Sequence, residues 1–433
     1  MQGATIVATA RTTPRWVTEG KAGVSAPRSR NRVAVLGGGL QGACVAMELA
    51  AGGATVDLFE ARERCLTAAS SQNEGKIHLG YVYANDPTRS TAQIMVRGAL
   101  SFWPLLRRWL GDAAQSIPVS RPFNYVVHAR SLLSAEQVEG HLHACHELAR
   151  QEIGSEAADY LGHDPRVAPV RLSRHELAAL YDRESVSAAF RTPERAIDPE
   201  ALAGLVRRRL DVDPSIRCRP GSRVQAVQRR NGGHEVEFLH AGRVRRERYD
   251  QVVNALWESR LAVDRTMGIE PPRRWMWREK HYVRVSAGHY DVPCTTIVLG
   301  PFGDVVAYPD GDLYLSWYPV GLRGVSTELA PPAWPSASAG GFSDELRHGI
   351  QEGLTAIVPA VGRLPSQIDG AKIKRGLIFA WGQSDIDDPA SELHERHAIG
   401  VHSFEGYHSV DTGKLTTAPL FGKVAADRVL AAA

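Results

Sequence analysis

A glycine cluster close to the N-terminus constrains the fold of this chain more than any other feature. A short apolar run ends at this cluster, which fits the pattern G-x-G-x-x-G on Gly37, Gly39 and Gly42. A helix-like run follows, and then a second apolar run that ends in Glu60. The expected strand, helix and strand span residues 33–36, 43–51 and 55–59. This order predicts a β-α-β unit that binds a dinucleotide.

Each residue of the pattern has a physical task. Gly37 permits the tight turn between strand and helix, and Gly39 lets a pyrophosphate approach the backbone. Gly42 lets the helix pack closely on the strand. The positive end of the helix faces the phosphates, and Glu60 lies where it can accept hydrogen bonds from both hydroxyls of an adenosine ribose. A glycine-rich turn in some other α/β protein is the alternative interpretation.

Composition excludes several classes of protein. The chain has 433 residues and a formal net charge of +3, which is too small to indicate a nucleic-acid partner. The length favours two domains or one large composite domain. Five scattered cysteines without a C-x-x-C pair argue against a disulfide framework and a zinc site, and they suit a reducing cytoplasm. The basic stretch over residues 1–30 is predicted to be a disordered tail, with a transit peptide as the alternative.

Beyond Glu60 the chain alternates between helical and strand-like segments. Asp198 is predicted to cap a helix that has Pro199 in its first turn. A meander of three strands and a buried strand follow, which is typical of the return into a dinucleotide-binding sheet. Predicted helices span residues 92–110, 134–152, 199–210 and 343–357, and predicted strands span 223–229, 235–240, 243–249, 251–256, 280–287, 295–299, 304–308, 312–317 and 398–401.

The C-terminal region contains a second strand–loop–helix unit. Thr416 or Thr417 is predicted to cap the terminal helix, with Pro419 in its first turn. The positive end of this helix can hold a pyrophosphate or the carbonyl edge of a flavin. An ordinary capped C-terminal helix is the alternative.

The order of these segments resembles the FAD-dependent D-amino-acid oxidase superfamily, which includes glycine and sarcosine oxidases and glycerol-3-phosphate and 2-hydroxyglutarate dehydrogenases. The resemblance rests on the glycine pattern, on SSQNEGKIHLGYVY over residues 70–83, on the helix opened by Ile197, Asp198 and Pro199, on VVNALW over residues 252–257 and on the loop TGKLTTAP. It implies an α/β fold with a Rossmann-like, discontinuous FAD-binding domain that includes the meander. It also implies an α+β substrate domain built on an antiparallel sheet. The implied FAD-binding parts span residues 31–90, 196–265 and 376–433, and the substrate-domain parts span 91–195 and 266–375.

The resemblance also implies a set of residues that bind FAD. The glycine pattern would hold the pyrophosphate, Glu60 the ribose, and the loop around Gly413 the flavin end. The strand over residues 252–257 lacks the glycine that relatives usually place after Ala255, and Trp257 is expected to fill that space. The full set is Gly37, Gly39, Leu40, Gln41, Gly42, Glu60, Arg62, Ser70, Ser71, Asn73, Lys76, His78, Val224, Ala255, Gly413, Lys414, Leu415 and Thr416.

Four residues are predicted to act in catalysis: His78, Tyr81, Lys280 and Tyr407. The segment around His78 is similar to the 2-hydroxyglutarate dehydrogenase pattern, in which a histidine lies near the isoalloxazine. In some relatives a histidine in this area carries the flavin covalently, whereas most hold FAD without a covalent bond. Tyr81 and Tyr83 alternate along an expected strand, with amphipathic surface tyrosines as the alternative.

Lys280 resembles the lysine that helps oxygen activation in amine oxidases of the superfamily. Arg284 is expected on the same face of its strand, where it could bind a substrate carboxylate bidentately. Solvated strand charges are the alternative for both. Tyr407 and His408 precede the TGKLTTAP loop and are expected near substrate or flavin. His141, His143, Cys145 and His146 do not converge on one helix face, so a solvated helix without a metal is predicted.

The resemblance implies an FAD-dependent oxidoreductase that transfers a hydride from a small-molecule substrate to flavin N5. The bond oxidised is the C–N bond of an amino acid or amine, or the C–OH bond of a 2-hydroxy acid, and the sequence leaves this choice open. A flavoprotein with structural FAD or a partner-binding role is the alternative. An NAD(P)H-dependent flavin monooxygenase is disfavoured because residues 409–413 lack its glycine–aspartate pair. No nucleic acid and no integral membrane segment are expected as partners, and a homo-oligomer is left open.

Overall fold

The glycine pattern lies between two parallel strands. The computed structural model describes residues 32–154, 159–288, 290–334, 342–364 and 368–432. In it β1 (Arg32–Leu36) leads into α1 (Leu40–Ala51), and β2 (Thr55–Phe59) then pairs parallel to β1. The predicted β-α-β unit is therefore confirmed. The tail predicted for residues 1–30 lies outside the described residues.

This unit forms the centre of a six-stranded sheet in the order β19-β20-β12-β1-β2-β8. Neighbouring strands are parallel except β19 and β20, which pair antiparallel. The remaining strands are β8 (Ile216–Arg219), β12 (Gln251–Asn254), β19 (Gly400–Phe404) and β20 (Tyr407–Asp411). Because the carboxyl ends of parallel strands meet at one edge, the loops after β1, β12 and β20 come together there.

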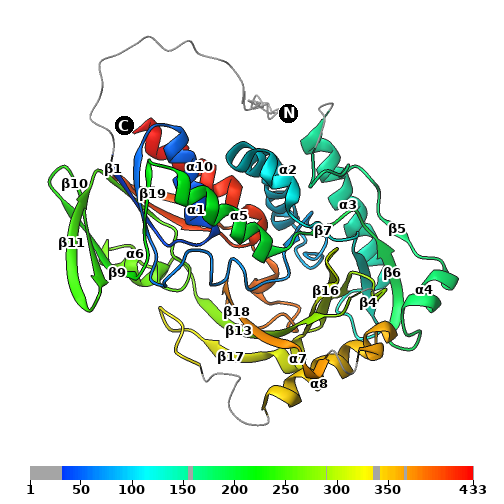
Figure 1. Cartoon of the computed structure of the whole chain (residues 1–433). Coiled ribbons are helices and arrows are strands. Elements are labelled where there is room, and N and C mark those ends of the chain that lie inside the picture. Colours follow the sequence, from blue (N-terminus) through cyan, green and yellow to red (C-terminus); the bar gives the residue numbers. More distant parts are fainter. Residues whose placement is uncertain (1–31, 155–158, 289, 335–341, 365–367, 433) are drawn as a thin grey trace, which may run out of the picture. The chain divides into compact units, whose positions relative to one another are not determined.

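The two faces of the sheet are covered by different layers. Successive side chains of a strand point to opposite faces, and Val33 and Val35 pack with the helices while Ala34 and Leu36 pack with the meander. The meander consists of β9 (Ser222–Arg230), β10 (Gly233–His240) and β11 (Arg243–Tyr249). Figure 1 shows α1, α5 (Pro199–Val212) and α10 (Ala418–Ala431) grouped on the helical face.

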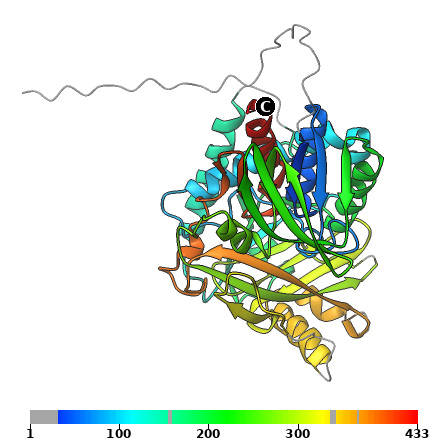
Figure 2. The same cartoon turned by 90° about the vertical axis from the view of Figure 1, so that its left-hand side faces the viewer.

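The second large sheet has nine strands in the order β17-β13-β16-β15-β14-β4-β6-β5, with β18 paired to β13. It is antiparallel except where β14 pairs parallel to β4. Figure 2 shows the six-stranded sheet with its meander above this second sheet. The strands are β4 (Asn124–His128), β5 (Val170–Arg171), β6 (Val186–Arg191), β13 (Trp275–Ser286), β14 (Thr295–Val298), β15 (Gly303–Ala307), β16 (Asp312–Trp317), β17 (Leu322–Ser326) and β18 (Lys372–Trp381). A mixed α/β fold with parallel and antiparallel sheets is thus confirmed.

The fold also contains helices and a two-stranded antiparallel sheet of β3 and β7. Asp198 caps α5 as predicted, with its side chain accepting from the N–H groups of Glu200 and Ala201. The predicted helix over residues 92–110 is α2, which stays continuous through Pro104, with its apolar face buried against α3 and α10. The remaining elements are α2 (Ser90–Leu110), α3 (Ala135–Ile153), α4 (Arg174–Leu180), α6 (Arg260–Thr266), α7 (Tyr318–Gly321), α8 (Phe342–Thr355), β3 (Lys76–Ile77), β7 (Arg195–Ala196) and the 3-10 turns η1 (Gly111–Ser116), η2 (Pro359–Arg363), η3 (Glu392–His394) and η4 (Leu415–Thr417).

The prediction of a solvated face for α3 is wrong. His141 and Cys145 are buried, and His141 Nε2 lies 3.1 Å from the carbonyl oxygen of Gly80 and 3.2 Å from Cys145 Sγ. The helix packs against α2, so these side chains face the core rather than water. Across the described ranges no group of three or more His, Cys, Asp or Glu side chains is arranged to hold a metal ion.

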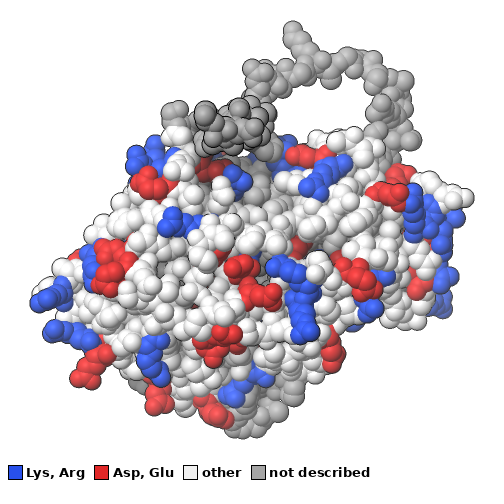
Figure 3. Space-filling model, turned by 180° about the vertical axis from the view of Figure 1, so that it is seen from behind, with Lys and Arg blue, Asp and Glu red and all other residues white. Residues whose placement is uncertain are grey.

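The surface has mixed charge. On the face shown in Figure 3, positive and negative side chains are interspersed. Among the helices that the structure describes, none is both long and apolar enough to cross a membrane.

Candidate functional site

The glycine pattern forms a close contact between α1 and β1. A Cβ atom at Gly42 would lie 1.9 Å from the carbonyl oxygen of Gly37, so no larger residue fits there without moving the helix. Gly37 has φ +99°, in the left-handed region that favours glycine. Gly39 is more open, since its Cβ would meet only Ser70 Oγ, at 3.2 Å. The pattern therefore leaves open space where Gly39 meets the start of α1.

The start of α1 retains unused polar groups. No side chain caps the helix, and the N–H of Leu40 donates to Ser70 Oγ over 2.8 Å. Gln41 is 5% exposed, and neither its Nε2 nor its Oε1 has a partner among the described residues. Buried polar side-chain atoms normally find partners. The helix N-terminus and Gln41 therefore fit a bound polar group such as a pyrophosphate.

Glu60 is fixed at the end of β2. Its carboxylate accepts from the N–H of Gly38 over 3.1 Å and from the N–H of Arg62 over 2.8 Å. Burial raises the pKa of Glu60 above its ordinary value, although the hydrogen bond from Arg62 opposes this. The carboxylate therefore lies against the glycine pattern, as its predicted role at the ribose requires.

A cavity of about 320 Å³ extends from the glycine pattern to the nine-stranded sheet. It is bordered by the start of α1, the segment after β3, the loop after β20 and strands β13 to β16. The predicted site residues that line it are Gly39, Leu40, Gln41, Ser70, Asn73, Lys76, His78, Ala255, Lys280, Gly413, Lys414 and Leu415. Segments that are distant in sequence therefore meet at one cavity.

Other predicted cofactor residues lie outside the cavity wall. Thr416 accepts from the N–H of His78 over 2.9 Å and so joins η4, the turn before α10, to the segment after β3. Arg62 is exposed and forms an ion pair of 3.4 Å with Glu258. Val224 is buried between the sheet and the meander, and Ser71 is buried with its hydroxyl 3.4 Å from the carbonyl oxygen of Ala68.

Lys414 places a cation in the cavity wall. Lys414 follows β20, and the carboxylate of Glu74 lies close enough to raise the pKa of its ammonium group. Burial lowers the pKa of Lys414 to about 8, with Arg396, Lys76 and Lys280 adding to the shift and Glu74 opposing it. Lys76 has its own partners, since its Nζ lies 2.6 Å from Asp304 Oδ1 and 2.5 Å from Thr296 Oγ1.

The cavity lining also includes two arginines and Lys280. Arg278 donates to Tyr318 Oη over 2.5 Å and to Asp385 Oδ1 over 2.8 Å. Lys280 Nζ lies 5.6 Å above the ring of Tyr318. Arg396 donates through Nε to the carbonyl oxygen of Leu393 over 3.0 Å. Neither Lys280 nor Arg396 forms an ion pair with a carboxylate of the described residues. This wall therefore offers positive charge to an anionic ligand.

The expectation for Arg284 is wrong. Its guanidinium lies 2.6 Å from Asp198 and 2.9 Å from Asp312, outside the cavity wall. Asp198 is the cap of α5, so Arg284 joins this helix to β13. Of the predicted alternating side chains, Lys280 and Tyr282 do line the cavity.

Tyr81 and Tyr407 do not reach the cavity. Tyr81 lies in a turn rather than the expected strand, and its ring packs edge-on against Tyr125 with centroids 5.8 Å apart. Tyr83 lines the cavity instead. Tyr407 is buried within β20, where its hydroxyl donates to Asp264 Oδ1 over 2.7 Å. His408 is also buried within this strand and does not line the cavity, whereas the loop that follows β20 does.

Sequence reasoning missed Arg278, Tyr318, Arg396 and Glu74. Arg278 has a signal in hindsight, because it alternates with Lys280 and Tyr282, but the predicted strand began at Lys280. Arg396 lies in an irregular segment between β18 and β19, where no periodic pattern marks it. Trp257, which is predicted to fill the space of the missing glycine, lines the cavity and donates to the carbonyl oxygen of Leu377 over 2.9 Å.

Comparisons with known proteins identify the family. A family model described as FAD dependent oxidoreductase matches residues 32–428. A search of curated proteins found no significant match.

Similar solved structures share the fold at low identity. A glycine oxidase from Geobacillus kaustophilus is 17% identical with a TM-score of 0.64, and the match covers 92% of this chain and 95% of that one. An L-α-glycerophosphate oxidase from Mycoplasma pneumoniae with FAD bound is 15% identical with a TM-score of 0.63, covering 93% and 95%. An iminodiacetate oxidase from Chelativorans sp. BNC1 is 15% identical with a TM-score of 0.63, covering 92% and 95%.

The family match spans both sheets and the cavity between the glycine pattern and β13. The open space at Gly39 and the unpartnered Gln41 fit a dinucleotide cofactor. The chain belongs to the family of FAD-dependent oxidoreductases.

Proposed function

We propose that this FAD-dependent oxidoreductase oxidises a small substrate that carries a carboxylate, at a C–N bond or at the C–OH bond of a 2-hydroxy acid. The supporting observation is Arg396, a guanidinium in the cavity wall that forms no ion pair with a carboxylate of the described residues. Guanidinium groups bind carboxylates through paired hydrogen bonds. A substrate carboxylate would supply the missing partner.

The surroundings of Arg396 support the same proposal. Burial lowers its pKa, with the nearby Arg278 adding to the shift. A bound anion would relieve this repulsion between two guanidinium groups. Lys280 and Tyr318 lie on the same wall and add a cation and a hydroxyl.

When bound, FAD would supply the redox chemistry as the acceptor of a hydride from the substrate carbon. Gly39, Leu40, Gln41 and the loop around Lys414 are the residues we propose to hold it. The similar structures include oxidases named for glycine, iminodiacetate and L-α-glycerophosphate. The same fold therefore serves both C–N and C–OH substrates.

The experiment compares purified holoenzyme with its Arg396→Ala variant. Pooled amino acids and pooled 2-hydroxy acids are added without oxygen, and bleaching of the flavin absorbance is followed. We expect one pool to bleach the flavin, with the half-saturating concentration raised about ten- to a hundredfold in Arg396→Ala, because hydrogen bonds to charged groups contribute about 1.5–3 kcal/mol.

Arg166→Ala serves as the control, because Arg166 is an exposed arginine that pairs with Asp164. If neither pool bleaches the flavin of the wild-type protein, the proposal is wrong and a structural FAD or a partner-binding role is favoured. If Arg396→Ala and Arg166→Ala bleach with the same half-saturating substrate concentration, Arg396 does not bind the substrate.

A further inference from the structure

Two cysteines that are far apart in the sequence meet beside the glycine pattern. Cys65 lies in the loop after β2, and Cys218 lies in β8. The two strands pair in parallel with Leu58 opposite Cys218, so the loop after β2 begins next to β8. Both cysteines are free, and their side chains form a hydrogen bond with each other. The tertiary structure therefore brings two thiols into direct contact.

The two thiols differ in exposure and in ionisation. Cys65 is 7% exposed, whereas Cys218 is partly exposed on β8, the last strand of its sheet. The hydrogen bond from Cys65 lowers the pKa of Cys218, although burial and the nearby Asp211 oppose it. The same bond raises the pKa of Cys65, together with burial and the charge of Glu60. Since the thiolate is the reactive form, Cys218 reacts first and Cys65 stays protonated beside it.

Cys65 also packs against the backbone of the glycine pattern. A Cβ atom at Gly38 would lie 2.7 Å from Cys65 Sγ and 2.9 Å from Glu60 Oε2. The N–H of Gly38 donates to Glu60 over 3.1 Å, and its carbonyl oxygen accepts from the N–H of Leu66 over 2.9 Å. The sulfur of Cys65 therefore touches the peptide segment that holds Glu60, the carboxylate predicted to bind the ribose.

We propose that Cys65 and Cys218 form a reversible disulfide beside the glycine pattern, with hydrogen peroxide as the oxidant. The Cys218 thiolate attacks one peroxide oxygen, the O–O bond breaks, and the sulfur becomes a sulfenic acid as hydroxide leaves. The sulfur of Cys65 then attacks the sulfur of Cys218, so that an S–S bond forms and the S–O bond breaks. The proton of Cys65 leaves with the hydroxyl group as water, and the proton first lost by Cys218 neutralises the hydroxide. The two thiols lose two electrons, and one peroxide becomes two molecules of water.

The disulfide would join the loop after β2 covalently to β8. Two backbone hydrogen bonds already connect this loop to the turn after β8, from Ser222 to the carbonyl oxygen of Glu60 over 2.8 Å and from Gly221 to that of Arg62 over 2.9 Å. A covalent link restricts the loop further. Because a bound ribose leaves only by separating from Glu60, the oxidised protein should release FAD more slowly. This consequence depends on the predicted role of Glu60.

The first test maps the disulfide in the holoenzyme. The protein is treated with hydrogen peroxide, alkylated and digested without reductant, and its peptides are identified by mass spectrometry. We expect a linked pair of peptides that contain Cys65 and Cys218, and its loss on treatment with dithiothreitol. Cys218→Ala should leave Cys65 free to be alkylated, and Cys65→Ala should leave a sulfenic acid on Cys218 that dimedone traps. Cys145→Ala, which changes a buried cysteine of α3, is the matched control and should keep the linked pair.

The second test measures the release of FAD, read from the rise in flavin fluorescence after dilution of the holoenzyme. Peroxide treatment should slow release about two- to tenfold, the usual gain from fixing one group at a binding site in advance. Dithiothreitol should restore the original rate. Release from Cys218→Ala should not respond to peroxide, whereas release from Cys145→Ala should respond as in wild type.

Two results would overturn the disulfide. One is full alkylation of both cysteines after peroxide treatment. The other is oxidation of Cys218 to a sulfinic acid while Cys65 remains free, because Cys65 would then not act as the resolving thiol. A disulfide that forms without changing the release of FAD would make the coupling to the cofactor wrong. None of these measurements uses a substrate, so their outcome is independent of the proposed function.

Discussion

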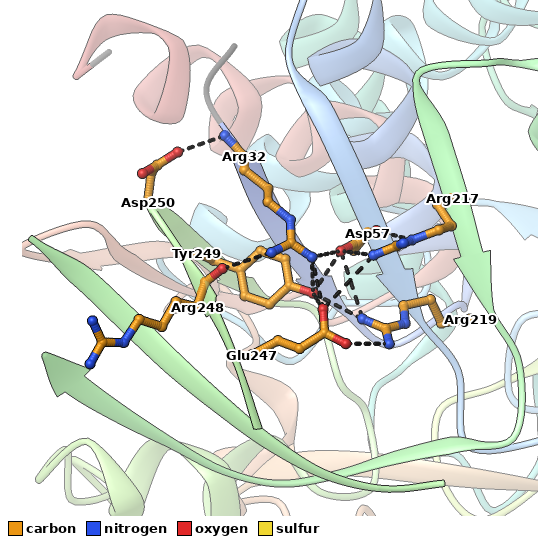
Figure 4. A network of polar contacts seen from close by, with 8 residues as sticks. All are labelled: Arg32, Asp57, Arg217, Arg219, Glu247, Arg248, Tyr249 and Asp250. Carbon is orange, nitrogen blue, oxygen red and sulfur yellow. Dashed lines mark hydrogen bonds and ion pairs between the residues drawn. The ribbon is translucent and has the colours of Figure 1, made fainter. Parts of the chain in front are cut away.

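Replacing Asp57 by asparagine tests whether a buried carboxylate joins the parallel sheet to the meander. Asp57 lies on β2 with its side chain 3% exposed. It accepts two hydrogen bonds from Arg217, of 2.6 and 2.7 Å, one of 2.8 Å from Arg32 and one of 2.6 Å from Tyr249. Figure 4 shows these groups converging from β1, β2, β8 and β11, with Glu247 beside them. Three strands of the sheet and one of the meander therefore share one carboxylate.

The magnitude follows from these contacts. Hydrogen bonds to charged groups contribute about 1.5–3 kcal/mol each, and breaking a buried ion pair costs about 3–5 kcal/mol. The side chains of Arg217 and Arg32 are 60% and 41% exposed, so water can solvate both once Asp57 is neutral. We therefore expect the lower end, about 3 kcal/mol. Unfolding entropy of about 2 cal/mol/K per residue converts this loss to a Tm about 3 °C lower for 433 residues.

The assay is thermal unfolding of the holoenzyme at fixed protein and FAD concentrations. Asp164→Asn is the control, because it removes an exposed partner of Arg166 and should change the Tm by less than about 1 °C. Equal Tm values for the two variants would refute the reasoning about Asp57.

Acid provides an independent check on the same network. Burial would raise the pKa of Asp57, but hydrogen bonds from Arg217, Tyr249 and Arg32 lower it overall. Hydrogen bonds from Arg219 and Arg32 lower the pKa of Glu247 from 4.5 to about 2, although burial opposes them. Carboxylates with depressed pKa values stabilise the fold above their unfolded pKa and lose this contribution as the pH falls toward the folded value. The difference in Tm between wild type and Asp57→Asn should therefore be full above the ordinary aspartate pKa of 3.8 and shrink as the pH falls below it toward the depressed pKa of folded Asp57.

Two further predictions concern the cofactor end of the cavity. Gly42→Ala places a Cβ 1.9 Å from the carbonyl oxygen of Gly37, so we expect it to cost about 1–3 kcal/mol and to raise the Kd for FAD at least about tenfold. Gly140→Ala is the control, because a Cβ at this position of α3 meets nothing within 4 Å. If FAD titrations give the Gly42→Ala and Gly140→Ala proteins equal Kd values, the expectation is wrong. Burial lowers the pKa of Lys414 to about 8, so acetate binding, read from the spectrum of bound FAD, should weaken as the pH rises through about 8 and the ammonium loses its charge. Lys414→Met should abolish this step, and a step that persists would assign it to another group.

Local patterns allowed much of the fold to be predicted from the sequence. Glycine spacing and apolar periodicity depend on neighbouring residues, so the β1-α1-β2 unit, the meander and the Asp198 cap of α5 were predicted in place. The family resemblance implied that Gly39, Gln41 and Lys414 bind one cofactor, and all three line one cavity. The sequence by itself thus determined a dinucleotide-binding sheet and the chain segments around it.

Only the tertiary structure decided which charged side chains meet. Arg284 and Lys280 share a strand, but Arg284 pairs with Asp198 from α5 while Lys280 faces the cavity. Glu194 and His78 come together because β3 and β7 pair antiparallel. Such partners depend on contacts between segments that lie far apart in the chain. Sequence periodicity gives the face of a strand or helix that a residue occupies, and the partner on that face follows from how the layers pack.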